Sequence, residues 1–358
     1  MKKKLVGMLA TATLLTTALA ENVQAAEIRS VGPDGEAAVD ASTIELTDDQ
    51  IAQIKEGGYT AAICLHYGGN DWSTSQQKGL EDTFGELGIE IVAVTDANFS
   101  AETQVSNIET VMAKKPDILV SIPTDATATA DAYKQAAAAG IKIVFMDQRA
   151  NGLEAGKDYV SVVSADNYGN GYASGTVLGD ALGGKGKVAM VYYDANFAPT
   201  NQRDEGFRDA MKNYPDIEIV TEQGFTDESG CAEQGDAILT QFPNIDGIYA
   251  SWDVPMEGVL SAVRAAGMEG KVTLACNDLG NNVAREIASG NIAGGGAQMP
   301  YDQGVAEAKL AALALLGEET PSYVAVPAET VTHENVLEAY TDVYHVETPD
   351  WLKEAYVE

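Results

Sequence analysis

Cysteine, histidine and basic residues are scarce in this sequence of 358 residues. It contains three cysteines, three histidines and 22 Lys and Arg residues against 54 Asp and Glu residues, so the formal net charge is −32. The cysteines, Cys64, Cys231 and Cys276, are widely spaced and show neither metal-ligand nor redox spacing. Nucleic acids and anionic membranes carry charge of the same sign as this chain, which argues against both as partners.

Long hydrophobic runs are also lacking beyond the N-terminus. No internal run approaches the roughly 18 apolar residues of a membrane-spanning helix. Residues 1–25 combine a lysine cluster, an apolar stretch and small-residue cleavage options ending at Ala20 and Ala25, a pattern that predicts a secretory signal peptide. No cysteine lies near these cleavage options, so we expect no lipid anchor. The sequence therefore predicts an exported protein, periplasmic or otherwise extracytoplasmic.

Common catalytic and cofactor motifs are missing as well. Gly68-Gly69 is not part of a G-x-G-x-x-G fingerprint, and the glycine- and lysine-rich run 183–187 precedes a predicted strand, so we interpret it as a tight turn. Neither G-x-S-x-G nor H-E-x-x-H occurs, and His66, His333 and His345 are far apart in the sequence. We therefore expect no metal, no cofactor and no enzymatic activity.

What the sequence does contain is a long alternation of strand and helix patterns. Residues 26–46 have no periodicity and are predicted to be a flexible leader. Thr47-x-x-Gln50 is a capping box that predicts a helix ending at Gly57-Gly58. From Tyr59 onward, apolar strand-like runs and helical runs alternate in two series. Repeated βα units of this kind indicate parallel, doubly wound sheets.

The number of predicted strands is too large for one compact sheet. The sequence therefore predicts an α/β protein with two similar doubly wound parallel-sheet lobes joined by a multi-segment hinge. We expect lobe one to comprise residues 47–164 and 299–328, and lobe two residues 165–298 and 329–340. Residues 341–358 should form a C-terminal tail that wraps a lobe surface.

Polar or aromatic side chains follow one predicted strand after another. In open α/β sheets, ligands bind beyond the carboxyl ends of the strands, which makes these residues candidates for a ligand site. They are His66, Asn70, Trp72, Asp147, Gln148, Trp252, Asp253, Asn277, Asp278 and Gln298. Each has a structural alternative, because a strand-end Asp or Asn also caps helices and a Trp also packs in a core. Asp278, for example, could cap a helix that begins near Asn282.

The order and spacing of these motifs resemble the periplasmic sugar-binding proteins of ABC importers, in the ribose-binding-like group of type I two-lobed proteins. The resemblance covers about residues 59–336. It is carried by Asn70-x-Trp72, Ile122-Pro123-Thr124-Asp125, Phe145-Met146-Asp147, Ser164-Ala165-Asp166-Asn167, Arg203-x-Glu205-Gly206-Phe207, Trp252-Asp253, Cys276-Asn277-Asp278 and Ala297-Gln298-Met299-Pro300. It implies a monomer that captures a small sugar or polyol between its lobes and delivers it to the membrane permease of an ABC importer. A chemoreceptor is a second partner that the resemblance suggests.

The sugar contacts of the family fall on Asn70, Trp72, Asp147, Phe225, Asp278 and Gln298, and His66 takes a further contact position on the first strand. The chain departs from the pattern at Gln148 and Asn201, which stand where the family has arginines, and at Trp252, which replaces an asparagine. Arg203 follows Asn201 by two residues and completes the candidate set. Carboxylates and amides suit sugar hydroxyls, and aromatic faces suit the C–H side of a sugar ring.

An exported enzyme of α/β fold remains the alternative. It would use Asp147 and Asp278 as a pair of carboxylates on a sugar substrate. The absence of a nucleophile motif argues against this alternative.

Overall fold

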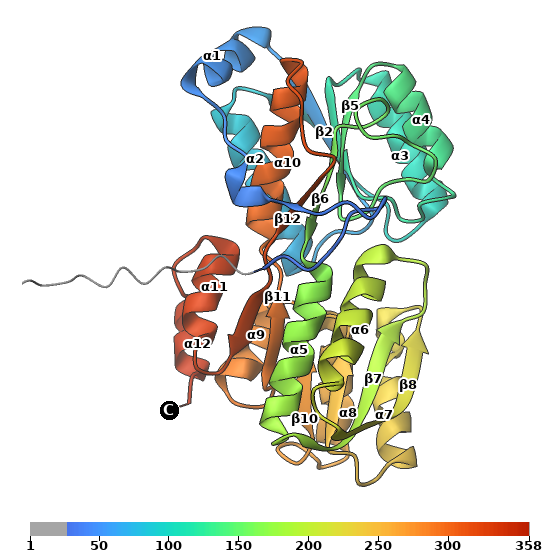
Figure 1. Cartoon of the computed structure of the whole chain (residues 1–358), viewed down its shortest axis with the longest axis vertical. Coiled ribbons are helices and arrows are strands. Elements are labelled where there is room, and N and C mark those ends of the chain that lie inside the picture. Colours follow the sequence, from blue (N-terminus) through green and yellow to red (C-terminus); the bar gives the residue numbers. More distant parts are fainter. Residues whose placement is uncertain (1–26, 358) are drawn as a thin grey trace, which may run out of the picture.

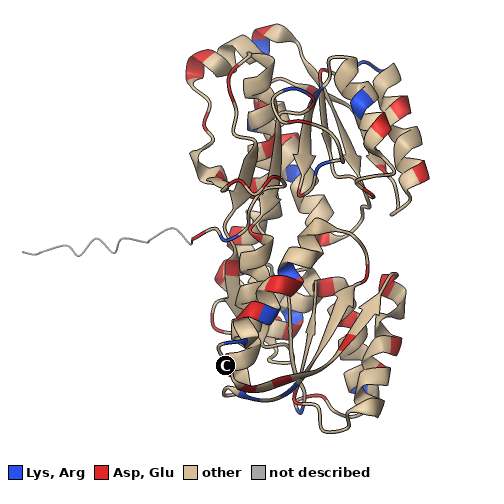
Figure 2. Ribbon diagram, turned by 45° about the vertical axis from the view of Figure 1, so that its right-hand side comes forward, with Lys and Arg blue, Asp and Glu red and all other residues tan. Residues whose placement is uncertain are grey.

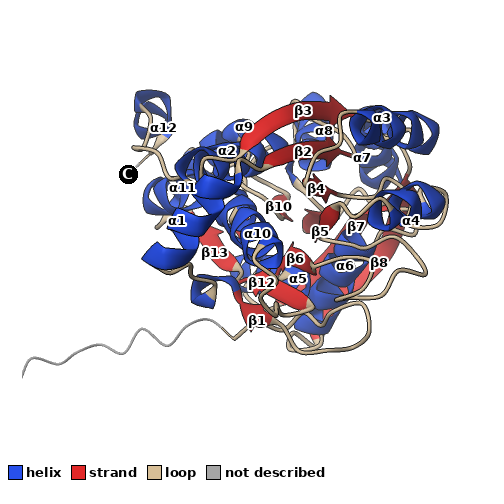
Figure 3. Ribbon diagram, turned by 90° about the horizontal axis from the view of Figure 1, so that it is seen from above, coloured by secondary structure: helices blue, strands red, loops and turns tan. Residues whose placement is uncertain are grey.

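Buried runs of Val, Ile, Leu and Ala form the strands of two α/β lobes in the computed structural model, which describes residues 27–357 (Figure 1). The predicted fold class is confirmed, because each lobe is a doubly wound sheet with helices on both faces (Figure 3). The predicted signal peptide, residues 1–25, lies outside the described residues. In the described chain, no helix is both long and apolar enough to cross a bilayer.

The first lobe is built on a sheet of parallel strands in the order β1-β12-β6-β5-β4-β2-β3. Its strands are β1 (Val39–Asp40), β2 (Thr60–Leu65), β3 (Glu90–Asp96), β4 (Ile118–Ser121), β5 (Lys142–Met146), β6 (Ser161–Ala165) and β12 (Tyr323–Val326). Its helices are α1 (Asp48–Gly57), α2 (Asp71–Glu86), α3 (Ala101–Ala113), α4 (Ala130–Ala138) and α10 (Pro300–Leu315), with a 3-10 turn η1 at Ala41–Thr43.

Strand β2 shows how the sequence pattern places this core. Its apolar residues alternate between two clusters, with Ile63 packed in the cluster that includes α2 and α10, and Cys64 in the cluster that includes α3 and α4. Successive side chains of a strand point to opposite faces of the sheet. A continuous apolar run is therefore what a strand covered by helices on both faces requires.

The second lobe repeats this plan with the strand order β13-β11-β10-β9-β7-β8, in which β13 is antiparallel to β11. Its strands are β7 (Lys185–Tyr193), β8 (Asp216–Phe225), β9 (Gly247–Ala250), β10 (Thr273–Cys276), β11 (Gly294–Ala297) and β13 (Glu329–Thr332). Its helices are α5 (Asn167–Ala181), α6 (Ala198–Met211), α7 (Cys231–Gln241), α8 (Asp253–Ala265), α9 (Asn281–Ala288), α11 (Val336–Tyr344) and α12 (Asp350–Ala355), with a 3-10 turn η2 at Glu228–Gly230.

The chain passes between the two lobes after β6, after β11 and after β12. At the first crossing, the buried carboxylate of Asp166 caps α5 by accepting a hydrogen bond from the backbone N–H of Gly169, at 2.9 Å. This carboxylate also accepts hydrogen bonds from the backbone N–H groups of Arg29 (2.9 Å) and Ser30 (2.8 Å). The start of the described chain is thus attached to a crossing segment.

These contacts correct the prediction that residues 26–46 form a flexible leader. Strand β1 pairs with β12 at the edge of the first sheet, and Asp34 forms a bidentate ion pair with Arg149, with both N–O distances 2.7 Å. The strand is only two residues long, which is too short to produce a hydrophobic period in the sequence. Tertiary contacts, not local propensity, order this segment.

The C-terminal segment packs on the second lobe. Leu352 of α12 is buried in the core of that lobe, and the backbone N–H of Val357 donates to the carbonyl oxygen of Ala288, at 3.1 Å. The expected boundary between lobe and tail, at residue 340, falls inside α11. Asp and Glu residues are spread over both lobes and far outnumber Lys and Arg (Figure 2).

Candidate ligand-binding site

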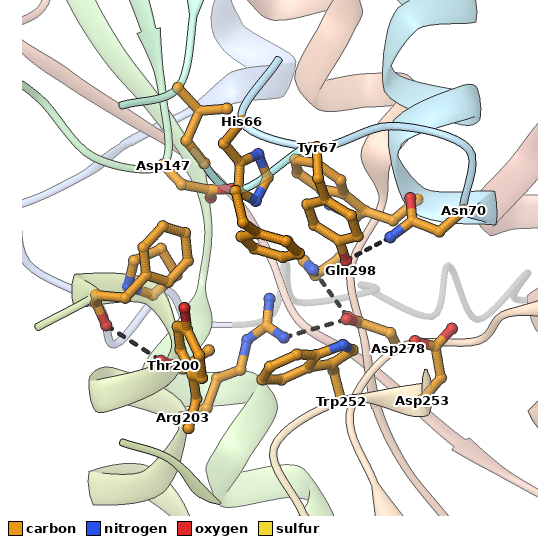
Figure 4. Close-up of a pocket in the computed structure, with 16 residues that line it drawn as sticks. His66, Tyr67, Asn70, Asp147, Thr200, Arg203, Trp252, Asp253, Asp278 and Gln298 are labelled. Atoms are coloured by element: carbon orange, nitrogen blue, oxygen red, sulfur yellow. Dashed lines mark hydrogen bonds and ion pairs between the residues drawn. The ribbon is translucent and has the colours of Figure 1, made fainter. Parts of the chain in front are cut away.

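A pocket lies between the lobes, at the carboxyl ends of the strands of both sheets (Figure 4). We call it the interlobe pocket. It is lined by His66, Tyr67, Asn70, Trp72, Phe99, Ile122, Asp147, Tyr193, Phe197, Pro199, Thr200, Arg203, Trp252, Asp253, Asp278 and Gln298. The two lobes contribute to it in similar ways, because right-handed βα crossovers place every strand-to-helix loop along the same edge of each sheet.

Asp147 and Asp278 hold corresponding positions in the two lobes. Asp147 directly follows β5, Asp278 is separated from β10 by Asn277 alone, and both have left-handed backbone angles, with φ of 53° and 69°. Such a conformation costs about 1–3 kcal/mol in a residue other than glycine and persists only where the surroundings impose it. Here the backbone N–H of each Asp donates to a neighbouring strand, to Val163 and Gly296 respectively. The fold thus turns both carboxylates toward the pocket.

Arg203 of α6 is the cation of the interlobe pocket. Its Nη1 donates to Oδ2 of Asp278 at 3.1 Å, and only 6% of the Arg203 side chain and 10% of the Asp278 side chain are exposed. Its remaining bonds go to Oδ1 of Asn167 and the carbonyl oxygen of Ser251. Oδ1 of Asp278 accepts a hydrogen bond from Nε2 of Gln298, at 2.8 Å. This network holds the carboxylate and the guanidinium in one orientation.

Two further carboxylates, those of Asp147 and Asp253, line the pocket. Burial raises the pKa of Asp147, although its Oδ1 accepts bonds from Ser164 Oγ (2.9 Å) and from the backbone N–H of Ala165 (3.3 Å). Burial also raises the pKa of Asp253, and the nearby charge of Asp278 adds to this effect. The pocket thus presents carboxyl oxygens from both lobes, and these can accept hydrogen bonds from a ligand.

Aromatic rings form most of the remaining wall. The ring of His66 stacks on Phe197 of the other lobe, with centroids 5.6 Å apart, and Tyr67 stacks on Phe99 at 4.1 Å. Trp252 meets Tyr193 edge to face at 5.6 Å. Such faces cover apolar C–H surfaces of a ligand.

Three buried polar atoms of the wall have no hydrogen-bond partner within the described residues. They are Nδ1 of His66, Nε1 of Trp72 and Oε1 of Gln298. Burial lowers the pKa of His66 to about 3, so its ring is neutral at physiological pH. Buried polar atoms are normally paired, so a ligand in the pocket could supply the missing partners of these three atoms.

Eight of the sequence-predicted site residues line the interlobe pocket: His66, Asn70, Trp72, Asp147, Arg203, Trp252, Asp278 and Gln298. Asn70 also has a structural role, because its Oδ1 caps α2 through the N–H of Ser73 and its Nδ2 donates to the Tyr67 hydroxyl. The alternative that Asp278 caps a helix is wrong. Helix α9 begins at Asn281 without a side-chain cap from its N-cap residue, and the Asp278 carboxylate bonds instead to Arg203 and Gln298.

The other three predicted residues, Gln148, Asn201 and Phe225, do not line the interlobe pocket. Gln148 is buried beside it, where its amide donates to the carbonyl oxygen of Pro123 and accepts from the N–H of Ala198. Asn201 is exposed on α6. Phe225 is buried behind the wall, with its ring 5.1 Å from Trp252. These three positions therefore support or flank the pocket.

Five polar or aromatic members of the wall were not predicted from the sequence, namely Tyr67, Phe99, Tyr193, Phe197 and Thr200, whereas Asp253 was noted at a strand end but not included among the expected ligand contacts. Tyr193 is the last residue of β7, and Tyr67 follows β2 by two residues. The strand-end rule applied to every strand would have found these two. Phe99, Phe197 and Thr200 lie further along their loops or in a helix, where only the packing of the lobes brings them to the pocket. Among the described residues, no group of His, Cys, Asp and Glu could hold a metal ion.

Comparison with known proteins agrees with this geometry. The ribose import binding protein of Salmonella typhimurium is 24% identical over 272 residues, which cover 76% of this chain and 90% of that protein. The D-ribose/D-allose-binding protein of Pseudomonas aeruginosa is 29% identical, over 73% of this chain and 83% of that protein.

Solved structures give the same result. An ABC transporter periplasmic solute-binding protein of Actinobacillus succinogenes with bound D-allose superimposes with a TM-score of 0.72 and 29% identity, over 78% of this chain and 99% of that one. A solute-binding protein of Agrobacterium vitis bound with α-D-tagatopyranose gives a TM-score of 0.73 and 26% identity, over 80% and 98%. The family model described as the periplasmic binding protein domain matches residues 61–319, and this chain therefore belongs to that family.

Proposed function

We propose that this chain is an exported solute-binding protein that captures a small sugar or polyol between its lobes and delivers it to the membrane permease of an ABC importer. The observation that carries the proposal is the interlobe pocket itself. Carboxylates from both lobes, a guanidinium and an amide lie there among aromatic rings, and this is the combination that binds vicinal hydroxyls and sugar C–H faces. The named ligands of the relatives, ribose, allose and tagatose, belong to the same chemical class.

The size of the interlobe pocket supports a role for lobe movement. Its cavity volume is about 50 Å³, whereas each enclosed water needs about 10–15 Å³ on this measure. A pentose or hexose is larger than the few waters this volume admits, so the lobes have to part for a ligand to enter. Closure around the ligand would then follow the hinge motion typical of two-lobed binding proteins.

Calorimetric titration with ribose, allose, arabinose, tagatose, allitol and myo-inositol tests the proposal. We expect at least one of them to bind with a dissociation constant near 1 μM, which requires about 8 kcal/mol. Bound ligand should be recovered chemically unchanged, and the radius of gyration measured by X-ray scattering should fall on binding. Failure of the folded protein to bind any sugar or polyol would contradict the proposal. Conversion of a sugar into a product would instead support the enzyme alternative.

Tryptophan fluorescence provides a matched control within the chain. Trp72 and Trp252 line the interlobe pocket, whereas Trp351 lies on α12 against Tyr340. We expect the double substitution Trp72→Phe and Trp252→Phe to remove most of the ligand-induced change in fluorescence and Trp351→Phe to leave that change intact. The reverse result would place the responding site outside the pocket.

A further inference from the structure

A second and larger cavity adjoins the interlobe pocket, and we call it the outer chamber. Its cavity volume is about 550 Å³, against about 50 Å³ for the interlobe pocket. It is lined by Tyr67, Gly68, Gly69, Asn70, Asn98, Phe99, Tyr193, Thr226, Asp227, Glu228, Trp252 and Val254, which come from both lobes.

The two cavities share part of their walls. Tyr67, Asn70, Phe99, Tyr193 and Trp252 line both of them. Four of these five residues are aromatic, so rings stand where the two cavities meet. A ligand that spans both cavities would therefore pass between aromatic faces.

The backbone next to these rings is strained in a way that positions one of them. Asn98 and Phe99 both have left-handed backbone angles, with φ of 47° and 58°, and such angles are uncommon for bulky residues. The Phe99 N–H donates to the carbonyl oxygen of His66 at 2.8 Å, and the Phe99 ring stacks on Tyr67 at 4.1 Å. Phe99 is nevertheless 39% exposed. The hydrogen bond to His66 and the stacking on Tyr67 hold the ring where it lines both cavities.

Charge limits what the outer chamber can hold. Its lining includes the acidic residues Asp227 and Glu228 and contains no Lys or Arg. Oε1 of Glu228 accepts a hydrogen bond from Nε1 of Trp252 at 2.8 Å, so this carboxylate is fixed beside a ring that lines both cavities. An anionic group such as a phosphate or a uronate would be repelled here, whereas hydroxyl groups could donate to the carboxylates.

We propose that the ligand is an uncharged disaccharide, or a glycoside of similar length, with one ring in the interlobe pocket, enlarged by the lobe movement described above, and its second unit in the outer chamber. The proposal rests on the proposed function and narrows its substrate class. It assigns Phe99 and Tyr193 to contacts with the ligand where it passes between the two cavities. It also explains why the chamber is bordered by aromatic rings and carboxylates, the residue types that suit a second sugar unit.

Matched pairs of sugars test this inference by titration calorimetry: xylose with xylobiose, glucose with cellobiose, and galactose with lactose. We expect one disaccharide to bind at least about tenfold more tightly than its monosaccharide, as one added aromatic contact provides. If a monosaccharide binds but no disaccharide binds more tightly, the inference is wrong and the proposed function stands. If no sugar of any kind binds, both fail.

Two substitutions test whether the second sugar unit binds in the outer chamber. Thr226 is exposed, lines only the outer chamber of the two cavities, and can be replaced by the bulky Trp. Thr226→Trp should reduce the advantage of the disaccharide over the monosaccharide to about twofold or less, because the larger side chain fills part of the chamber. Thr240→Trp, at an exposed position on α7, should preserve the advantage. An advantage that survives Thr226→Trp would show that the second unit lies elsewhere and would overturn the inference.

Discussion

Replacing Asp278 with Asn should weaken both folding and ligand binding. The substitution keeps the size of the side chain but removes the charge that pairs with Arg203. Both partners are almost fully buried, so the variant leaves a guanidinium charge in the interior without its counterion. Removing one partner of such a pair costs about 3–5 kcal/mol of folding free energy.

The cost should lie near the lower end of this range, at about 3 kcal/mol. Arg203 retains its bonds to Asn167 and to the carbonyl oxygen of Ser251, and the charge of Asp147 is close enough to interact with it. Ligand affinity should fall by a further 1–3 kcal/mol, roughly ten- to hundredfold, because a ligand hydroxyl loses a charged acceptor.

Two further variants separate the side chain from the backbone. Because Asp278 has a φ of 69°, Gly fits this position without strain, whereas Ala does not. Asp278→Ala should therefore be less stable than Asp278→Gly by about 1 kcal/mol. Both variants lack the carboxylate, so their ligand affinities should be similarly reduced.

Urea unfolding followed by circular dichroism measures the stabilities, and titration calorimetry measures the affinities. Asp131→Asn is the control, since the Asp131 side chain is 90% exposed on the surface of α4. Surface changes of this kind alter stability by about 0.5 kcal/mol or less. If Asp278→Asn is as stable as the wild type, the buried pair is not what stabilises Arg203. If its affinity is unchanged, Asp278 is not a ligand contact.

Three other outcomes follow from the structure. Burial raises the pKa of Asp204 to about 7. The free energy of unfolding of the wild type should therefore fall as pH rises from about 4 to 7. The Asp204→Asn variant does not titrate at this position, so by pH 7 its stability should have gained up to about 4 kcal/mol relative to the wild type. If the stabilities of the wild type and of Asp204→Asn, measured by urea unfolding, change in parallel across this pH range, the prediction is wrong. Asp71 on the first lobe accepts bonds from the N–H and the side-chain amide of Asn281 on the second, at 2.7 and 2.8 Å. Asp71→Ala should thus lower ligand affinity about two- to fivefold. The variant should also show a larger radius of gyration in X-ray scattering than the wild type. An unchanged radius and affinity would contradict a role of Asp71 in closure. Asp166→Asn should cost about 1–2 kcal/mol and speed hydrogen exchange at the Arg29 N–H, and unchanged protection would show that the carboxylate does not hold this segment.

The sequence alone determined the two-lobed α/β plan. Few other folds can bury apolar runs that are separated by amphipathic segments, and local signals marked the ends of helices and strands. Thr47 and Gln50 form the predicted capping box, and Gly58 ends α1 in the left-handed conformation. The sequence also indicated Asp147 and Asp278, because a polar residue within two positions of the end of an apolar strand lies on the ligand edge of a parallel sheet.

Only the tertiary structure decided which neighbouring side chains face the pocket. Asn201 and Arg203 are two residues apart on one helix, so they point in very different directions, and packing turned Arg203 inward and left Asn201 exposed. Phe225 ends its strand as Tyr193 does, yet it lies behind the wall that Tyr193 lines. The order in residues 27–46 likewise comes from contacts with β12 and Asp166, far away in the sequence. Such choices depend on long-range packing, and local periodicity carries no information about it.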